Sequence, residues 1–360
     1  MTPVAHSAPA DDARLRPLDG LALLRSEFRR RGWSDKATGR VIGELSSRAT
    51  VALSGIVLMY WQPAWWSFLV GLALATAGSL GVATNTHSSS HYASSDRRWV
   101  NELLTYLGYP FFLMLSATYW HRKHVVIHHT NPNVVGVDDD IDLMPWFALT
   151  REEFERASGF RRVYYRCQWI LLPLAIAVTG FQMHVAGWRH VIRTLADPTV
   201  RRTAHWIDLG CMVLHLIVWI ALPAYLLDPV IAIEVYVARI VLMGFGLFAV
   251  LAPAHLPHEA CFLRREAMAA DFVLRQTATT VNYRSGVVAR FVCSGLQYQI
   301  EHHLFPSMSH VHYPAIQPMV ERFCERHGYP YRVLSWPVAV WRSLQAFWMV
   351  RDVGTLRRAD

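Results

Sequence analysis

Cysteine is scarce in this chain, and the cysteines that it has show no pairing pattern. The five cysteines among 360 residues form no Cys-x-x-Cys pair. This argues against an iron–sulfur cluster or a zinc–thiolate site and indicates reduced, structural thiols. The sequence also lacks an internal repeat, a low-complexity tract and a Gly-x-Gly-x-x-Gly loop followed by a βαβ pattern. A nucleotide-binding fold is therefore not expected, and neither is a nucleic-acid partner.

Charged residues are also few. They make up 17% of the chain, against 53% hydrophobic residues, and the formal net charge is +8. A chain that is both this apolar and this basic is more typical of an integral membrane protein than of a soluble one. We therefore expect an all-α membrane protein.

The polar residues divide the chain into three parts. Residues 1–48 are polar and basic, and we expect them to form a cytosolic segment. Within it, residues 1–17 are rich in Ala, Asp and Pro, and they are expected to be disordered. Residues 49–335 are expected to form the membrane domain. Residues 336–360 begin with an aromatic amphipathic segment that we expect to lie on the membrane surface.

Histidine, by contrast, is abundant and clustered. The chain has 18 histidines, and many of them gather in three short clusters that hydrophobic segments separate. Neutral imidazole is the commonest protein ligand for transition metals, so we expect the fold to bring the clusters together around metal. The eight candidate ligands are His87, His91, His124, His128, His129, His255, His302 and His303.

The spacing within the clusters indicates two metal ions. Residues four apart share a face of a helix, so a pair such as His124 and His128 can bind one ion. His129 lies about a quarter-turn further round that helix. The adjacent residues His302 and His303 also point apart, which suits ligands of two different ions. A single octahedral ion cannot use eight imidazoles and still leave room for a substrate. Weaker candidates, as ligands or as groups that orient the ligands, are Gln299, His121, His258, Asn282, His310 and His312.

Six apolar segments surround the clusters. They are residues 49–62, 65–82, 101–119, 169–185, 209–226 and 230–252. Short turns join the first two segments and the last two, so we expect two membrane hairpins and four spans. The clusters can meet on one side of the membrane only if segments 101–119 and 169–185 do not cross, and we expect these two to re-enter or to lie at the interface. Lysine and arginine are absent from the two outer turns, which places both termini and the clusters in the cytosol.

Three polar features lie outside the clusters. His215 and Arg239 fall inside the second hairpin, where we expect a structural polar contact between its arms. The acidic run Asp138–Asp142 is interpreted as a solvated turn or as a partner for basic residues. His184 is expected to be an ordinary surface or interface residue.

Imidazole-rich sites suit zinc, copper, iron and nickel. Soluble di-iron bundles use Glu-x-x-His on their helices, and this chain contains neither that motif nor His-Glu-x-x-His. A di-iron site here would therefore have to be dominated by histidine.

These residues carry a resemblance to the membrane fatty acid desaturase family, and in particular to its front-end or linoleoyl-CoA-desaturase-like branch. The third cluster, Gln297-Tyr298-Gln299-Ile300-Glu301-His302-His303-Leu304-Phe305-Pro306, closely resembles the signature of that branch, in which Gln replaces the first His of the box. Similar matches are His310-Val311-His312-Tyr313-Pro314, the second cluster with Thr130, Asn133, Gly136 and the acidic run, and Thr279-Thr280-Val281-Asn282. The resemblance covers roughly residues 50–335.

The chain departs from the family pattern in two places. Ser88 stands where Asp is common after the first histidine of box one, and Val125 stands where Asn is common in box two. These departures bear on substrate and regiochemistry more than on the metal site. The branch often carries a fused cytochrome b5 domain, but this sequence has no His-Pro-Gly-Gly heme motif.

The resemblance implies an O2-dependent enzyme with two non-heme iron ions that introduces a double bond into an acyl chain. The acyl group would be carried by CoA, a lipid or an acyl carrier. Two electrons per turnover would come from outside, from a ferredoxin or a cytochrome b5-like protein with its reductase. The protein would lie in membrane lipid, in the plasma membrane if its source is bacterial.

Other functions remain open at this point. A hydroxylase or acetylenase on the same scaffold would use the same oxidant, and the mass of the product would distinguish it. A zinc hydrolase of lipid amides would need neither O2 nor an electron donor. A metal transporter would place its histidines inside the spans, and here His215 alone lies there.

Overall fold

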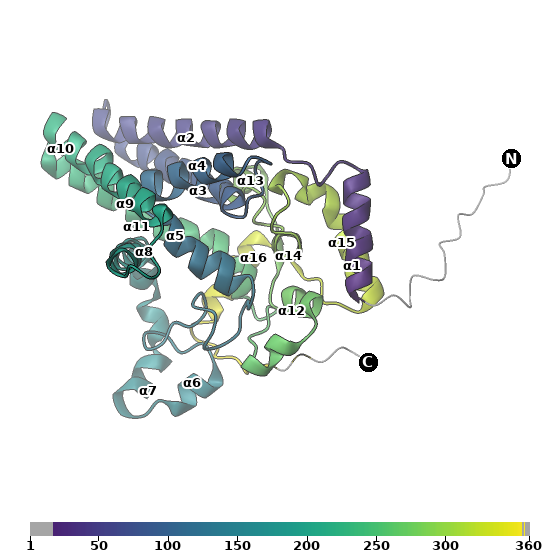
Figure 1. Cartoon of the computed structure of the whole chain (residues 1–360). Helices are drawn as coiled ribbons and strands as arrows, with labels where there is room; N and C mark the ends of the chain where they lie inside the picture. Colours follow the sequence, from purple (N-terminus) through teal and green to yellow (C-terminus); the bar gives the residue numbers. More distant parts are fainter. Residues whose placement is uncertain (1–16, 355, 357–360) are drawn as a thin grey trace.

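The computed structural model describes residues 17–354 and 356. In this part of the chain the protein is almost entirely helical (Figure 1). Its two strands, β1 (Asn282–Arg284) and β2 (Val333–Ser335), have three residues each and pair in parallel. The expected all-α membrane architecture is confirmed. The expected disorder of residues 1–17 falls on residues 1–16 outside the described part, while Pro17 begins helix α1.

Four of the described helices are long and apolar enough to cross a membrane. They are α2 (Thr38–Trp61), α3 (Ser67–Ser90), the continuous run α9 (Thr203–Leu216), η5 (Ile217–Ala221) and α10 (Leu222–Leu226), and α11 (Pro229–His255). They form the two hairpins that the sequence predicts. Helix α2 runs through residue 48, so the expected end of the N-terminal segment lies inside a helix. Helix α3 continues past the apolar segment and carries the first histidine cluster on its last turn.

Glycines set the distance between the two helices of the first hairpin. A Cβ atom on Gly55 would lie 2.3 Å from the backbone nitrogen of Ala75, and one on Gly78 would lie 2.3 Å from that of Ala52. Any larger side chain would therefore force α2 and α3 apart. Small residues of this kind are how membrane helices gain close packing where lipid offers no hydrophobic driving force.

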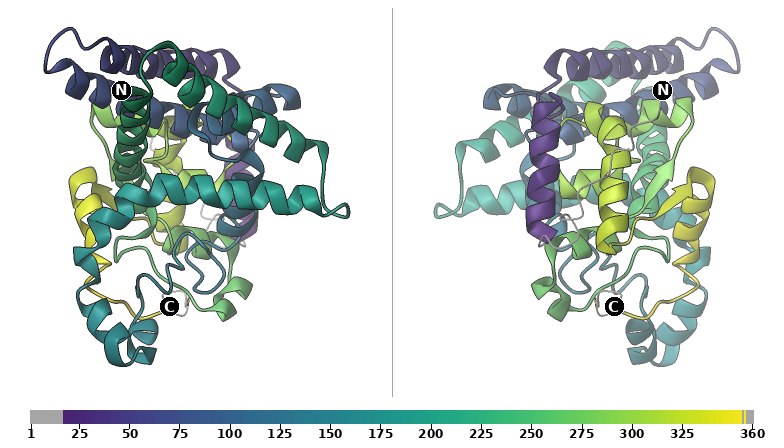
Figure 2. Two further views of the ribbon diagram at one scale, coloured as in Figure 1. Left: turned by 90° about the vertical axis from the view of Figure 1, so that its left-hand side faces the viewer. Right: turned by 90° about the vertical axis from the view of Figure 1, so that its right-hand side faces the viewer.

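Helix α8 (Leu172–Ala196) contains the second segment that was expected not to cross. It has 25 residues but is not among the four candidate spans. Its second half is less apolar than its first and carries Arg189 and Arg193. It is seen nearly end-on in Figure 1 and along its length in Figure 2, left. It packs against α11. A short arm that contains α6 (Arg151–Arg156), α7 (Gly159–Arg166) and η4 (Gln168–Ile170) leads into it.

The other segment that was expected not to cross is broken into α4 (Arg98–Tyr106), the π-helix η2 (Leu107–Leu113) and α5 (Ala117–Trp120). Its backbone leaves carbonyls without helical partners, and side chains of neighbouring helices bond to them. His215 Nδ1 and Trp219 Nε1 donate to the Phe111 carbonyl at 2.7 and 2.9 Å, and His184 Nε2 donates to the Leu113 carbonyl at 3.0 Å. Irregular backbone among membrane helices is stable only when protein groups satisfy it in this way. His184 is therefore a buried structural partner, and the expectation of an ordinary surface or interface residue was wrong.

Two polar contacts join the arms of the second hairpin. His215 Nε2 lies 3.0 Å from the Tyr236 hydroxyl, and the Arg239 guanidinium lies over the Trp219 ring at 5.2 Å. His215 and Arg239 thus each contact the opposite arm, as expected, but each does so through an aromatic partner.

Asp208, on the same hairpin, fixes the start of α5. The carboxylate is fully buried and accepts hydrogen bonds from the Ser116 and Thr118 hydroxyls and from the backbone of residues 117 and 118, at 2.6–3.1 Å. A buried carboxylate is stable only with several donors. The Asp208 carboxylate holds the point where the broken segment that contains η2 and α5 turns toward the second histidine cluster.

The remaining elements carry or surround the histidines. These are η3 (His121–His128), η6 (Arg265–Ala269), α12 (Phe272–Ala278), α13 (Val287–Cys293), α14 (Gln299–Leu304), η7 (His310–His312), α15 (Tyr313–His327) and α16 (Trp336–Gln345). Phe28 of α1 (Pro17–Arg30) is buried against Phe305 and α15, so the polar N-terminal segment contributes to the core of this cap. Helix α16 opens the expected amphipathic tail and packs on α11, where Trp336 Nε1 donates to the Ala249 carbonyl at 2.7 Å.

Candidate metal centre

The eight candidate histidines come from four separate elements, and the fold brings them together. The ends of spans α3 and α11 supply three of them, η3 and the residue after it supply three more, and α14 supplies the last pair. Their ring nitrogens form two groups, each within 4.8 Å. We call them the five-histidine group (His87, His91, His124, His129 and His302) and the three-histidine group (His128, His255 and His303).

The adjacent pairs divide between the two groups. His302 belongs to one and His303 to the other, as the sequence predicts. In the second cluster the spacing of side chains that share a face differs from the expected one. Residues 121–128 form a π-helix, in which residues five apart align. The nitrogen of His129 donates to the His124 carbonyl at 3.0 Å, and the two Nε2 atoms lie 3.1 Å apart. His124 therefore joins His129 in the five-histidine group, although His124, His128 and Asp140 also lie within 4.8 Å of one another.

Hydrogen bonds fix the rings of the three-histidine group. His128 Nδ1 lies 2.9 Å from Asp138 Oδ2, and His255 Nδ1 lies 3.2 Å from the Thr279 carbonyl. His303 Nδ1 lies 2.8 Å from Gln276 Oε1. All three partners are acceptors, so each Nδ1 carries hydrogen and each Nε2 keeps its lone pair. This is the arrangement in which a metal-binding histidine is usually found.

Gln276 connects the two groups. Its Nε2 donates to the His129 carbonyl at 2.9 Å, which leaves its Oε1 to accept from His303. Asn133 provides a link within the three-histidine group, because its amide donates to the His255 carbonyl at 2.9 Å while its backbone nitrogen donates to Asp138, the partner of His128. Sequence reasoning missed Gln276 and did not assign Asp138 this role. Asp138 follows the second histidine cluster closely in the sequence, which is a signal, whereas Gln276 lies near none of the three clusters.

The five-histidine group is held mainly by close packing of its rings. His302 Nε2 lies 2.9 Å from His87 Nε2 and 3.0 Å from His129 Nε2. Two nitrogens that bind one ion at about 2.1 Å and at right angles lie about 3 Å apart. The spacing therefore fits ligands of a shared ion. Within this group and among the described residues, a single Nδ1 lies within hydrogen-bond distance of an acceptor side chain, that of His302 beside the Tyr313 hydroxyl at 3.2 Å, while His124 Nδ1 lies 3.8 Å from Asp140 Oδ2.

The protonation and hydrogen bonding of the rings also fit metal. Burial lowers the pKa of His302 and His303 well below the usual range, and nearby histidines lower it further. These rings are therefore neutral at physiological pH. The Nε2 atoms of His91 and His303 are buried and have no hydrogen-bond partner, which is costly unless something binds them. His128 is an exception, because Asp138 and Asp140 outweigh the effect of burial and raise its pKa overall, so this ring has to release a proton before it can bind metal.

The acidic run is mostly part of the site. Asp138 is fully buried and Asp140 half-buried, and Asp140 pairs with Lys123 at 2.8 Å. The pairing with a basic residue was one of the two expected roles. The expectation of a solvated turn holds only for Asp139 and Asp142, which are exposed.

The six weaker candidates lie around the two groups. Gln299 is buried and lines the cavity described below. His121 and His258 are exposed and belong to neither group.

The other three bond to protein groups. Asn282 donates to Glu301 at 2.8 Å, and His312 to the Asp35 carbonyl at 3.0 Å. His310 lies between Ser88 Oγ at 2.7 Å and Glu44 Oε2 at 3.1 Å. Ser88, one of the two departures, thus contacts a histidine that is outside both groups.

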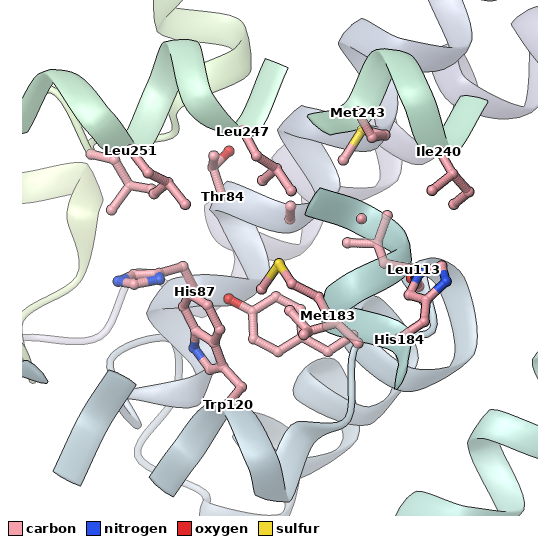
Figure 3. Close-up of a pocket in the computed structure, with 15 residues that line it drawn as sticks. Thr84, His87, Leu113, Trp120, Met183, His184, Ile240, Met243, Leu247 and Leu251 are labelled. Atoms are coloured by element: carbon pink, nitrogen blue, oxygen red, sulfur yellow. The ribbon is translucent and has the colours of Figure 1, made fainter. Parts of the chain in front are cut away.

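A cavity of about 700 Å³ reaches the histidines from the side of α8 and α11. His87, His128 and His255 line it, together with mainly apolar residues. A narrow apolar pocket of about 60 Å³ lies beyond His87 and Trp120, which line both spaces. Figure 3 shows this pocket, with His87 at one end and His184 at the other. The two spaces together suit an extended apolar chain that passes the metal centre.

Comparison with known proteins agrees with this geometry. The fatty acid desaturase family model matches residues 63–335. The Delta(5) fatty acid desaturase fat-4 of Caenorhabditis elegans is 27% identical over 82% of this chain and 64% of its own length. The sn-1 linoleoyl-lipid 6-desaturase of Arthrospira platensis is 29% identical over 74% of this chain and 73% of its own. The acyl-lipid (9-3)-desaturase of Physcomitrium patens is 26% identical over 82% and 56%.

The chain thus spans between 56% and 73% of the length of these three relatives. The family match covers well over half of the chain and includes all eight histidines of the two groups. The protein belongs to the fatty acid desaturase family.

Proposed function

We propose that this protein is an O2-dependent, di-iron desaturase of acyl chains. The observation that carries the proposal is a set of eight histidines, seven of them buried and His255 partly exposed, divided into two groups at a mainly apolar cavity of about 700 Å³. The five-histidine group would hold one iron ion and the three-histidine group the other. Relatives that are named as fatty acid or acyl-lipid desaturases support the same reaction.

The iron pair would supply the oxidant that removes one hydrogen from each of two neighbouring methylenes, with O2 and two external electrons consumed. The balance is one O2, two electrons and two protons taken up, with one double bond and two water molecules formed. The protein would supply the geometry. Its apolar cavity excludes water and holds the chain against the histidines, and the acceptors on Nδ1 keep each Nε2 of the three-histidine group aimed at its ion.

The proposal includes an external electron donor, a ferredoxin or a cytochrome b5-like protein with its reductase. It also places the site and both termini on the cytosolic side. The turns that join α2 to α3 and α10 to α11 carry no Lys or Arg, whereas the loop between α8 and α9 carries Arg201 and Arg202. This distribution supports a cytosolic site by the positive-inside rule.

The test combines metal content and product. Detergent-purified protein should contain about two iron ions per chain, and cells that express it should gain an unsaturated acyl species two hydrogens lighter than its precursor. A product that gains one oxygen would assign a hydroxylase instead. Protein that holds zinc, no iron and hydrolyses lipid amides would contradict the oxidase altogether.

A further inference from the structure

The large cavity opens to the surface through an apolar rim. Four residues that line it are also exposed: Trp146 to 68%, Leu174 to 63%, Leu171 to 43% and Met144 to 38%. Large exposed apolar side chains cost free energy in water, about 25 cal/mol per Å². Several of them at the lining of one cavity therefore mark a surface that something apolar covers.

Helix α7 is fastened to this rim. The Tyr164 hydroxyl donates to the Trp146 carbonyl and the Tyr165 hydroxyl to the Pro145 carbonyl, both at 2.8 Å. Figure 1 shows α6 and α7 as a projection beyond α8. The helix exposes Phe160 to 84% and Val163 to 59%. Its apolar residues thus extend the rim outward from the mouth of the cavity.

The same short helix is basic. Arg161, Arg162 and Arg166 are all exposed, and α7 contains no acidic residue. The residues that follow it, Trp169 and Ile170, are exposed to 49% and 57%. Aromatic and aliphatic side chains beside arginines are the composition of a helix that lies at a lipid headgroup layer. The cations suit lipid phosphates, and the apolar side chains suit the acyl region below them.

The polar side of the cavity has the opposite charge. Asp139, Asp140 and Asp142 line it. Among the described lining residues the one lysine or arginine is Lys123, which is paired with Asp140 at 2.8 Å. A carrier with several phosphates, such as coenzyme A, would meet carboxylates in this part of the cavity. Like charges brought together in this way disfavour binding.

We propose that α7 and the rim lie on the anionic surface of the bilayer and that the cavity admits the acyl chain of an intact glycerophospholipid from the side. The phosphate of that lipid would stay near the arginines of α7, and its chain would pass the rim to the histidines. The inference rests on the proposed function, because it names the acyl carrier on which the desaturase acts.

The test supplies one acyl group on two carriers. Iron-loaded protein is reconstituted in phosphatidylcholine vesicles with a reduced ferredoxin system, and the labelled chain is offered either on phosphatidylglycerol or as the CoA thioester. We expect the double bond to form in the phosphatidylglycerol. Desaturation of the thioester alone would overturn the inference and leave the proposed function standing. No product from either carrier, in protein that holds its iron, would overturn the proposed function as well.

Two sets of variants test the role of α7. The triple variant Arg161→Gln, Arg162→Gln, Arg166→Gln should lower the initial rate on phosphatidylglycerol by roughly five-fold or more, without loss of iron. The matched control Arg29→Gln, Arg97→Gln, Arg322→Gln removes three exposed arginines elsewhere and should leave the rate unchanged. Equal loss in both triples, or no loss in the first, would contradict a specific role for α7.

Discussion

The two histidine groups differ in how their rings are held. Every ring of the three-histidine group has a fixed acceptor on Nδ1: Asp138 for His128, Gln276 for His303 and a backbone carbonyl for His255. In the five-histidine group, among the described residues, one Nδ1 has a side-chain acceptor within hydrogen-bond distance, that of His302. Rings contact one another in both groups, with centroids 4.4–4.9 Å apart around His302, His129 and His91 and 4.5–5.1 Å apart in the three-histidine group, but the larger group has more rings in contact.

This difference indicates two ways of building a metal site. A group with three ligands gains its geometry from hydrogen bonds outside it, which set each tautomer and ring orientation. A group with five ligands needs less of that support, because the neighbouring rings already restrict one another. The three-histidine group should therefore be the more sensitive of the two, both to loss of a ligand and to loss of a supporting acceptor.

The largest predicted effect is the loss of a ligand. His303→Ala leaves the three-histidine group with two histidines, so iron should fall to about one per chain, and desaturation should be lost. His91→Ala leaves four histidines in the other group and should retain more iron, although its activity should also fall. Elemental analysis of both purified variants, beside product analysis, measures the difference.

His258→Ala is the matched control, because that histidine is exposed and belongs to neither group. It should keep both iron and activity. Equal iron loss in His303→Ala and His91→Ala would show that the two groups do not differ in this way.

The sequence predicts which histidines the fold brings together better than it predicts how they divide into two groups. Histidine clusters between apolar segments are a strong signal, and the parity of the spans is enough to bring them to one side. The regrouping of His124 with His129 depends on a π-helix, and an assumed α-helical period of 3.6 residues assigns it wrongly. A single inserted residue per turn changes which side chains align, and composition gives no sign of it.

The next effect in size is the loss of an acceptor. Asp138→Asn removes the carboxylate that accepts from His128, and iron affinity should fall by roughly 10- to 100-fold. Tyr313→Phe removes the hydroxyl beside His302 in the five-histidine group, where ring packing remains, and its effect should be at least several-fold smaller. Iron retained after competition with a chelator measures both, in protein whose elution on gel filtration is unchanged. A larger loss in Tyr313→Phe would reverse the proposed contrast.

The supporting residues are also where sequence reasoning reaches its limit. Asp138 lies in an acidic run that resembles a solvated turn, and Gln276 is an ordinary polar residue in a short helix. The role of Gln276 depends on a backbone path that brings segments more than 100 residues apart within hydrogen-bond distance, as for Gln276 and His129. Asp138 is close to His128 in the sequence, but its role depends on how the irregular loop after the second cluster turns back onto that histidine. His184 is similar, because its partner is a carbonyl freed by a break in a distant helix. No local pattern encodes such contacts.

The last prediction concerns the pH dependence of stability and the residue that precedes the third histidine pair in the sequence. Glu301 precedes His302 and is fully buried. Burial raises its pKa to about 7, although hydrogen bonds from Tyr331 and Asn282 oppose the rise. A carboxyl whose pKa is higher in the folded state than in the unfolded state binds more protons when folded. Its contribution to stability is therefore complete below about pH 4.5 and is lost as the pH rises through 7, a change of roughly 3 kcal/mol.

Glu301→Gln should remove most of this dependence, because an amide keeps the shape and stays neutral. Thermal unfolding in detergent between pH 5 and pH 8 should show a falling Tm for the natural protein and a flatter curve for the variant. Glu325→Gln, an exposed substitution on α15, should follow the natural protein. If the Tm of Glu301→Gln falls with pH as the Tm of the natural protein does, the charge at residue 301 does not govern the pH dependence of stability.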